Sequence, residues 1–220
     1  RDVTGVQTCA LPIFKILIGA NNVENMNIKL LCTDVEGCGQ VFLAYFIESH
    51  YPDECTYKKG INTILYHSER ENPNAKILNT TFKENVNKLI SEKNAYEAIL
   101  VNDDGYITEG SRSNMFFIWN LKVYTASSKE VLLGVTRKHI MKVCDELKLD
   151  VVEENIHTDD LGKIDGAFMS GTSVNVLPIS TIDDFSYDSV NNHIIMKIAN
   201  GYLREIEEYI KENKGIWGRS

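Results

Sequence analysis

The sequence predicts a fold that combines helices and strands, in the α+β class. Short apolar runs bounded by turn residues are typical of strands, and three longer stretches repeat their apolar residues at helical spacing. With 43% hydrophobic residues among 220, the chain is long enough to bury a substantial core. Strands are expected near residues 28–32, 41–47, 61–66, 98–102, 114–118, 123–126, 167–171 and 177–182.

The first helical stretch follows Lys76. Its apolar residues fall at positions i, i+4, i+7 and i+8, on one face that can pack into a core: Phe82, Val86, Leu89 and Ile90. Lys76 therefore lies just ahead of an anchored element, in the segment Asn-Ala-Lys-Ile-Leu-Asn at 74–79. A lysine considered alone is most often a solvated surface charge, so this position identifies a site only together with other signals.

Glu109 lies at the end of a predicted hairpin. The run 97–102 and the turn residues Asp-Asp-Gly at 103–105 are typical of a strand followed by a tight turn. The chain returns through residues 106–108 and presents Glu109 at a sheet edge, directly before Gly-Ser-Arg-Ser-Asn at 110–114. The alternative is a glutamate in a solvated turn, which is the usual environment of this residue type.

A Gly-Val-Thr sequence at 134–136 precedes the second helical stretch, whose apolar residues are Ile140, Val143, Cys144 and Leu147. The backbone N–H groups of Val135 and Thr136 should lie at the N-terminus of this helix, where free donors and the helix dipole favour a phosphate. The alternatives are that Thr136 is a plain helix cap and that Leu132 is an ordinary core leucine.

Two further segments complete the candidate elements. Thr172 follows the apolar run 166–169 in a Gly-Thr-Ser sequence, which taken alone is a weak signal. The third helical stretch, at 190–211, carries one apolar stripe and is expected to be a closing core helix.

Charge and cysteine content exclude several classes of protein. The net charge of −8 and the pI near 5.2 argue against broad nucleic-acid binding. No apolar run approaches the roughly 20 residues that a membrane helix requires. The five cysteines form no Cys-x-x-Cys pair and no zinc-ligand pattern with histidine, so no metal site is expected. Reduced thiols in a cytoplasmic metabolic enzyme are the simpler interpretation.

Together and in this order, these segments resemble the class IV aminotransferases, the family of branched-chain and D-amino-acid aminotransferases and aminodeoxychorismate lyase. The resemblance runs from about Asn27 to the region of Tyr209 and is densest from Tyr96 to Phe117. It implies the larger, C-terminal domain of a fold-type IV enzyme, a pseudo-barrel of mostly antiparallel strands with outer helices. It also implies pyridoxal 5'-phosphate as cofactor, amino acid and 2-oxo acid substrates, and a homodimer.

The resemblance implies a role for each site residue. Lys76 is implied to link covalently to the cofactor aldehyde and to move a proton, since a pyridoxal enzyme needs an amine for both tasks. Glu109 is implied to face the pyridine nitrogen, where a carboxylate keeps the ring protonated. The other implied contacts are to the cofactor for Ser111, Leu132, Val135, Thr136 and Thr172, and to the substrate for Arg112 and Ser173.

The leading hypothesis for the reaction is transfer of an amino group between an amino acid and a 2-oxo acid. An alternative within the same resemblance is the aminodeoxychorismate lyase reaction, which uses the same lysine but eliminates pyruvate. Thr81 departs from the tyrosine that the branched-chain enzymes carry at this position, which weakens that assignment. A second alternative is a cofactor-binding or structural fragment without activity.

The start of the chain is expected to be foreign to the fold. Residues 3–13 match the translation of a common sequencing-adapter string and lack the basic run and long apolar core of a signal peptide. The expected organisation is an adapter-derived segment at 1–13, a remnant of an N-terminal domain or connector at 14–26, a catalytic domain at 27–213 and a tail at 214–220. By resemblance, a preceding domain would supply an arginine to the phosphate, so the chain as given is expected to bind the cofactor poorly.

Overall fold

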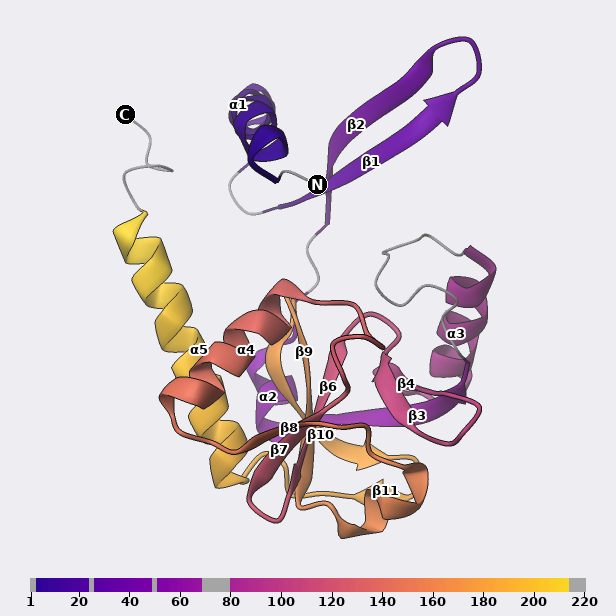
Figure 1. The fold of residues 1–220 in the computed structure, drawn as a ribbon. Helices are drawn as coiled ribbons and strands as arrows, with labels where there is room; N and C mark the ends of the chain where they lie inside the picture. The colour runs from indigo at the N-terminus through magenta and orange to yellow at the C-terminus, as the bar shows by residue number, and fades with distance from the viewer. Residues whose placement is uncertain (1–2, 24–25, 49–50, 69–79, 214–220) are drawn as a thin grey trace. The chain divides into compact units, whose positions relative to one another are not determined.

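The computed structural model describes residues 3–23, 26–48, 51–68 and 80–213 (Figure 1). The contacts within the chain divide it into two compact units, residues 1–51 and 52–220. Among the described residues, no helix is both long enough and apolar enough to cross a membrane.

The first unit contains one helix and one hairpin. The helix α1 (Val3–Asn21) passes through residues 3–13, which were expected to be foreign to the fold. The strands β1 (Asn27–Val35) and β2 (Gly39–Ile47) pair antiparallel over their whole length. Gly37 and Gly39 in the turn have φ angles of +81° and +73°, a backbone region that favours glycine.

The hairpin confirms the strands expected near 28–32 and 41–47. Within the described part of the chain, β1 and β2 pair only with each other and form a sheet of two strands. The contacts divide the chain between residues 51 and 52, and the expected catalytic domain at 27–213 stays a prediction.

The second unit is built on one curled sheet with helices outside it (Figure 1). Its strands are β3 (Ile61–His67), β4 (Glu97–Val101), β5 (Ile107–Gly110), β6 (Asn114–Trp119), β7 (Lys122–Thr125), β8 (Val151–Glu153), β9 (Gly166–Gly171), β10 (Asn175–Ile182) and β11 (Phe185–Ser186). Its helices are α2 (Glu54–Lys59), α3 (Thr80–Glu92), α4 (Val135–Glu146), the 3-10 helix η1 (Thr158–Lys163) and α5 (His193–Glu212).

The strands of this sheet follow the order β5, β4, β3, β10, β9, β6, β7 and β8, with β11 paired to β10. Five of the eight described pairings are antiparallel, and the pairings of β3 with β10, β3 with β4 and β7 with β8 are parallel. The predicted α+β fold, a pseudo-barrel of mostly antiparallel strands with outer helices, is therefore confirmed, and the sheet is curled into a half-barrel.

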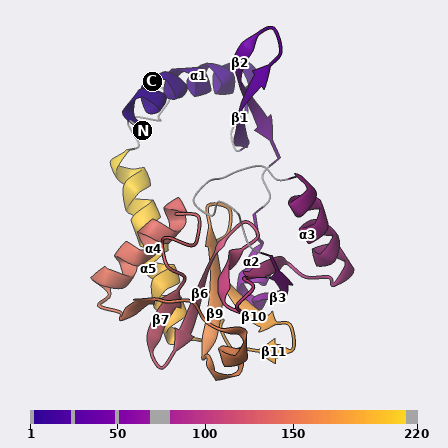
Figure 2. The same ribbon diagram turned by 45° about the vertical axis from the view of Figure 1, so that its right-hand side comes forward.

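The strand β6 explains why the sheet is apolar on both faces. Successive side chains of a strand point to opposite faces, so Met115 and Phe117 enter one core cluster while Phe116 and Ile118 enter the other. The second cluster is closed by α4 and α5, which lie side by side (Figure 2). Phe116 stacks on Phe168 of β9 with the ring centroids 4.8 Å apart. Both faces of β6 are buried, as its unbroken apolar run indicates.

Four short elements were not expected from the sequence: α2, β8, η1 and β11. Each is too short to show a clear periodicity, so local contacts must identify it. In α2, for example, the Asp53 carboxylate accepts a hydrogen bond from the backbone N–H of Thr56 at 2.7 Å and so caps the helix. In the second unit, the three longer helices α3, α4 and α5 confirm the three predicted helical stretches.

Cys144 on α4 is expected to resist alkylation in the folded protein. Its side chain is buried in the second core cluster, and burial raises the pKa of the thiol to about 12, so the reactive thiolate is scarce. Cys38 and Cys55 are exposed. Iodoacetamide at mildly alkaline pH, followed by peptide mass spectrometry, should label these two cysteines quickly and Cys144 only after urea is added. Equal labelling without urea would mean that the cluster opens readily.

Candidate functional site

Glu109 lies near the end of β5 with only 3% of its surface exposed. The predicted hairpin places it there: the Asn102 side chain accepts from the N–H of Tyr106 at 2.8 Å, and Gly105 adopts φ +84° in the turn. The Glu109 carboxylate accepts a hydrogen bond from the backbone N–H of Leu132 at 3.2 Å. A buried carboxylate is costly unless it is paired, so this contact identifies a positioned group and excludes the solvated turn glutamate.

A tight turn connects Glu109 to β6. The N–H of Gly110 donates to the carbonyl of Ser113 at 2.8 Å, and the N–H of Ser111 donates to the carbonyl of Ala98 on β4 at 2.9 Å. A Cβ atom at Gly110 would collide with the Ser113 hydroxyl. Gly110 is therefore required by the close approach of the two sides of the turn.

Leu132 is held through both of its backbone polar groups. Its N–H donates to Glu109, and its carbonyl accepts from the Asn114 side-chain amide at 2.9 Å and from the N–H of Gly134 at 2.8 Å. A Cβ atom at Gly134 would collide with Oδ1 of Asn114. The loop that leads into α4 is consequently clamped between side chains from β5 and β6.

The contacts of Glu109 and Asn114 with Leu132, which we call the clamp, lie directly ahead of the N-terminus of α4. Gly134 is the N-cap residue with φ −63° and ψ 141°, and because glycine has no side chain, the first N–H groups of the helix receive no cap from it. Such groups bind anions well, since they lack intrahelical partners and lie at the positive end of the helix dipole. The predicted positions of Val135 and Thr136 at the N-terminus of this helix are confirmed.

Two buried hydroxyls lack a hydrogen-bond partner among the described residues, one in the first turn of α4 and one on β9. Thr136 is 2% exposed, and within the described ranges its Oγ1 has no hydrogen-bond partner. The same is true of Oγ of Ser170 on β9, which pairs with Asn114 of β6. Buried hydroxyls without a partner are uncommon in native proteins. An uncapped helix terminus with orphaned hydroxyls fits the donor set that a phosphate group needs, and it argues against the plain cap for Thr136.

The predicted residues Thr172 and Ser173 lie in the turn that joins β9 to β10. Thr172 is exposed and Ser173 is half-buried. The Tyr57 hydroxyl on α2 donates to the carbonyl of Val174 at 3.0 Å and supports this turn. Burial raises the pKa of the Tyr57 phenol, so the hydroxyl keeps its proton for that bond across the neutral pH range.

Arg112 and Ser111 are engaged by Glu97, a residue that was not among the sequence-based candidates. The Arg112 guanidinium is 61% exposed but donates to the carbonyl of Tyr96 at 2.9 Å, and its Nε lies 3.5 Å from the Glu97 carboxylate. The Ser111 hydroxyl donates to the same carboxylate at 2.5 Å. Lys76 lies outside the described residues, so its role stays a prediction.

Sequence reasoning missed three residues of this site: Glu97, Asn114 and Ser170. A signal existed for Glu97, because a charged residue begins a run that is otherwise apolar through Val101. Asn114 lies within the Gly-Ser-Arg-Ser-Asn run, but its contact with Leu132 joins residues that are distant in sequence. No local pattern marks Ser170.

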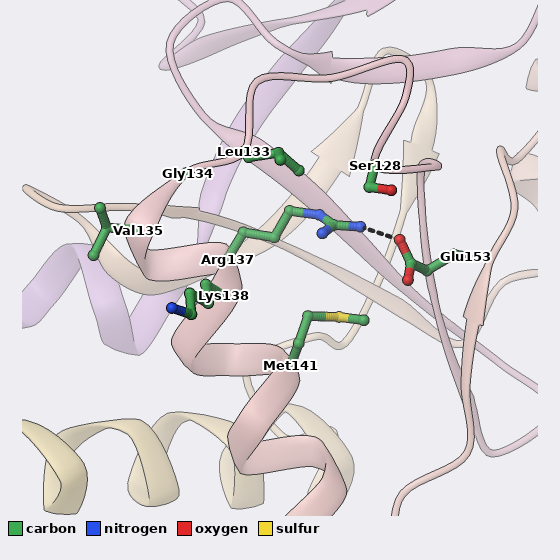
Figure 3. A pocket seen from close by; sticks show the side chains of 8 residues that line it. All are labelled: Ser128, Leu133, Gly134, Val135, Arg137, Lys138, Met141 and Glu153. Carbon is green, nitrogen blue, oxygen red and sulfur yellow. Dashed lines mark hydrogen bonds and ion pairs between the residues drawn. The ribbon is translucent and has the colours of Figure 1, made fainter. Parts of the chain in front are cut away.

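A pocket of about 340 Å³ lies beside the first turn of α4 (Figure 3). The buried Arg137 crosses it and forms an ion pair with Glu153 of β8 at 2.8 Å, while also donating to the carbonyl of Ala126 at 2.9 Å. The pocket is lined by Ser128, Leu133, Gly134, Val135, Arg137, Lys138, Met141 and Glu153. Glu109 and Thr136 do not line this pocket, so we do not interpret it as the cofactor site. Because Arg137 binds Glu153 and the carbonyl of Ala126, we interpret it as a residue that anchors α4 to β8 and to the end of β7.

The half-barrel sheet and the clamped loop at its edge define a domain of the fold-type IV aminotransferase kind. The family described as "Amino-transferase class IV" matches residues 13–182, and the chain belongs to this family.

The relatives agree with this family. A branched-chain-amino-acid aminotransferase from Pseudomonas aeruginosa is 28% identical over 180 residues, which cover 74% of this chain and 58% of that protein. A D-alanine aminotransferase from Bacillus licheniformis is 32% identical over 109 residues, which cover 49% of this chain and 38% of that protein. The chain thus spans about half the length of the curated relatives that it matches, or less.

Among solved structures, the branched-chain aminotransferase from the thermophilic archaeon Thermoproteus uzoniensis, determined with norvaline, has the same fold. It superposes with a TM-score of 0.73 at 23% identity, over 88% of this chain and 70% of that one.

Proposed function

We propose that this chain carries the cofactor-binding part of a pyridoxal-phosphate-dependent aminotransferase, which transfers an amino group between an amino acid and a 2-oxo acid. The observation that carries this proposal is the contact between the buried Glu109 carboxylate and the N–H of Leu132, two residues before the N-cap of α4. This contact connects the Glu109 carboxylate, which is suited to a pyridine nitrogen, to the N-terminus of α4, which is suited to a phosphate.

The residues present fit pyridoxal phosphate at both of its charged ends. The phosphate would be held by the N–H groups of Val135 and Thr136 and by the hydroxyls of Thr136 and Thr172, with the orphaned hydroxyl of Ser170 as a further donor. Glu109 would hold a proton on the ring nitrogen. The cofactor, when bound, supplies an electron sink for the carbon that loses a proton.

Leu132, Ser111 and Lys76 complete the proposed cofactor contacts. The backbone of Leu132 is held by Glu109 and Asn114, and its side chain would pack against the ring. The Ser111 hydroxyl donates to Glu97, and Ser111 is proposed to contact the cofactor because it lies in the turn that directly follows Glu109. Lys76 would form the covalent link and move the proton, as its sequence context suggests.

The substrate contacts are proposed to come from Arg112 and Ser173. Arg112 is a partly exposed cation whose orientation is held by Tyr96 and Glu97, so its remaining donors can meet a substrate carboxylate without a large loss of side-chain entropy. We also propose a homodimer in a reducing cytoplasm, as the resemblance and the cysteine pattern imply.

The proposed reaction is tested by loading the chain with pyridoxal phosphate and adding a panel of L- and D-amino acids together with 2-oxoglutarate. A transaminase passes nitrogen to the 2-oxo acid, which is measured as glutamate by mass spectrometry. A lyase instead releases pyruvate from aminodeoxychorismate and leaves 2-oxoglutarate unchanged. Chain that binds no cofactor at high pyridoxal phosphate concentration would contradict the proposal.

Thr136→Val is expected to weaken binding of pyridoxal phosphate by about 1 to 3 kcal/mol, because a donor to a buried charged acceptor is lost. The same change should leave the stability of the cofactor-free chain equal or higher, since it removes a buried hydroxyl without a partner. Fluorescence titration and thermal unfolding measure the two effects, and Thr172→Val should weaken phosphate binding by a similar amount.

Thr63→Val is the matched control for Thr136→Val. The Thr63 hydroxyl is equally buried but donates to the carbonyl of Thr181 at 2.8 Å. Its removal should therefore lower stability and leave the preference for pyridoxal phosphate over pyridoxal unchanged. If Thr136→Val weakens pyridoxal and its phosphate equally, the assignment of Thr136 to the phosphate is wrong.

A further inference from the structure

Glu97 is the most deeply buried charged side chain of the second unit among the described residues, with 0% of its surface exposed. It begins β4, whose other residues are apolar and buried. Its Oε1 accepts from the N–H of Ala98 at 3.0 Å and from the Ser111 hydroxyl at 2.5 Å. Its Oε2 accepts from the Ser113 hydroxyl at 3.1 Å and lies 3.5 Å from Nε of Arg112. Three hydrogen bonds and one ion pair thus surround the carboxylate.

All three side chains that contact Glu97 come from consecutive positions, residues 111–113: two hydroxyls that donate hydrogen bonds and the Arg112 guanidinium that forms an ion pair. This segment is the turn between Glu109 and Asn114, the two side chains that clamp Leu132 from either side. A shift of the turn would move both ends of the clamp together. Glu97 therefore connects to Glu109 through the turn at residues 111–113, and to the N-terminus of α4 through Glu109 and Leu132.

We propose that Glu97 is a positioning residue of the cofactor site, which orients Glu109 and the start of α4 through residues 111–113 without contacting the cofactor. The inference rests on the proposed function for its effect on the cofactor. Its effect on the turn and on the clamp is independent of that function.

The charge of Glu97, and not only its shape, is required. In Glu97→Gln, the side-chain NH₂ must replace either Oε1 or Oε2. At Oε1 it would face the N–H of Ala98, and at Oε2 it would face Nε of Arg112, and neither of these groups can accept a hydrogen bond. The first orientation buries a donor against a donor, and the second removes the negative charge that pairs with Arg112, so both are costly although the size of the side chain is unchanged.

Glu97→Gln is the test, with Glu205→Gln as the matched control. Glu205 is a partly buried carboxylate that contacts His139 at 2.9 Å and accepts from Lys142 at 2.8 Å, and it lies on α5 away from the turn. In the chain without cofactor, amide hydrogen exchange at Ser111 and Leu132 should be at least about tenfold faster in Glu97→Gln and unchanged in Glu205→Gln, because both N–H groups belong to the proposed network.

The second readout is the bound cofactor. Glu97→Gln should weaken pyridoxal phosphate binding by about tenfold and should shift the pH dependence of the cofactor absorption band in the same direction as Glu109→Gln, which a general loss of stability would not do. Unchanged exchange and an unchanged pH profile in a folded Glu97→Gln variant would overturn the inference. If wild-type chain binds no cofactor, the proposed function fails, while the exchange experiment still decides the role of Glu97.

Ser113→Ala keeps the experiment decisive if Glu97→Gln does not fold. It removes one donor and leaves the carboxylate, so it should accelerate exchange at Leu132 by a smaller factor. The effect of the double variant Ser111→Ala/Ser113→Ala on stability should differ from the sum of the two single effects, because both hydroxyls act through Glu97. If the effects of the two substitutions on stability are strictly additive and the amide exchange rate of Leu132 does not change, the turn does not control the contacts of Leu132.

Discussion

Lys76→Ala is expected to abolish covalent attachment of pyridoxal phosphate and to lower turnover by several orders of magnitude. The reason is that one side chain is proposed to supply both the covalent link and the proton transfer. Borohydride fixes such a link permanently, so peptide mass spectrometry should find the reduced cofactor on the Lys76 peptide of the wild-type chain and on no peptide of the variant. Non-covalent binding should remain, because the phosphate contacts are unchanged.

Lys83→Ala is the control for this experiment, since Lys83 is an exposed lysine on the neighbouring helix α3. It should behave as the wild-type chain in labelling and in turnover. A Lys76→Ala variant that keeps near-normal turnover, or a cofactor label on another lysine of the wild-type chain, would show that Lys76 is not the catalytic amine.

Glu109→Gln should lower kcat strongly while cofactor binding largely survives. The glutamine keeps the shape of the side chain, and its carbonyl oxygen can still accept from the N–H of Leu132, so the clamp stays closed. What is lost is the negative charge that would keep the ring nitrogen protonated. Stopped-flow measurement of the half-reaction, with the absorption spectrum of the bound cofactor followed across pH, separates this loss from a loss of binding.

Glu154→Gln is the control for Glu109→Gln, because it removes the same charge from an exposed glutamate away from the site. It should alter neither the spectrum nor kcat. If Glu109→Gln also leaves both unchanged, the carboxylate does not act on the ring and its burial has another cause.

Local sequence patterns were sufficient for the elements that carry Glu109 and Thr136. The hairpin around residues 103–105 depends on turn residues that are adjacent in sequence, and α4 depends on an apolar repeat within twelve residues. Both are short-range effects, and the structure confirms both.

Long-range pairing could not be predicted in the same way. β3 lies beside β10, with Ile61 opposite Ile179, and nothing in either strand specifies that partner. The same limit explains why the roles of Glu97 and Asn114 were missed: each becomes evident only when its hydrogen-bond partner on a distant turn or loop is known. An acidic or amide side chain in an apolar strand indicates a buried partner but does not say which one.

The double hold on Leu132 has a consequence for changing this protein by design. Glu109 and Asn114 hold one residue from two strands, and a side chain at position 134 would collide with Oδ1 of Asn114. The proposed ring chemistry and the proposed phosphate affinity therefore cannot be adjusted separately. A library that varies positions 109, 114 and 134 one at a time should yield mostly weakened proteins, and improved variants should come from combinations in which the three change together.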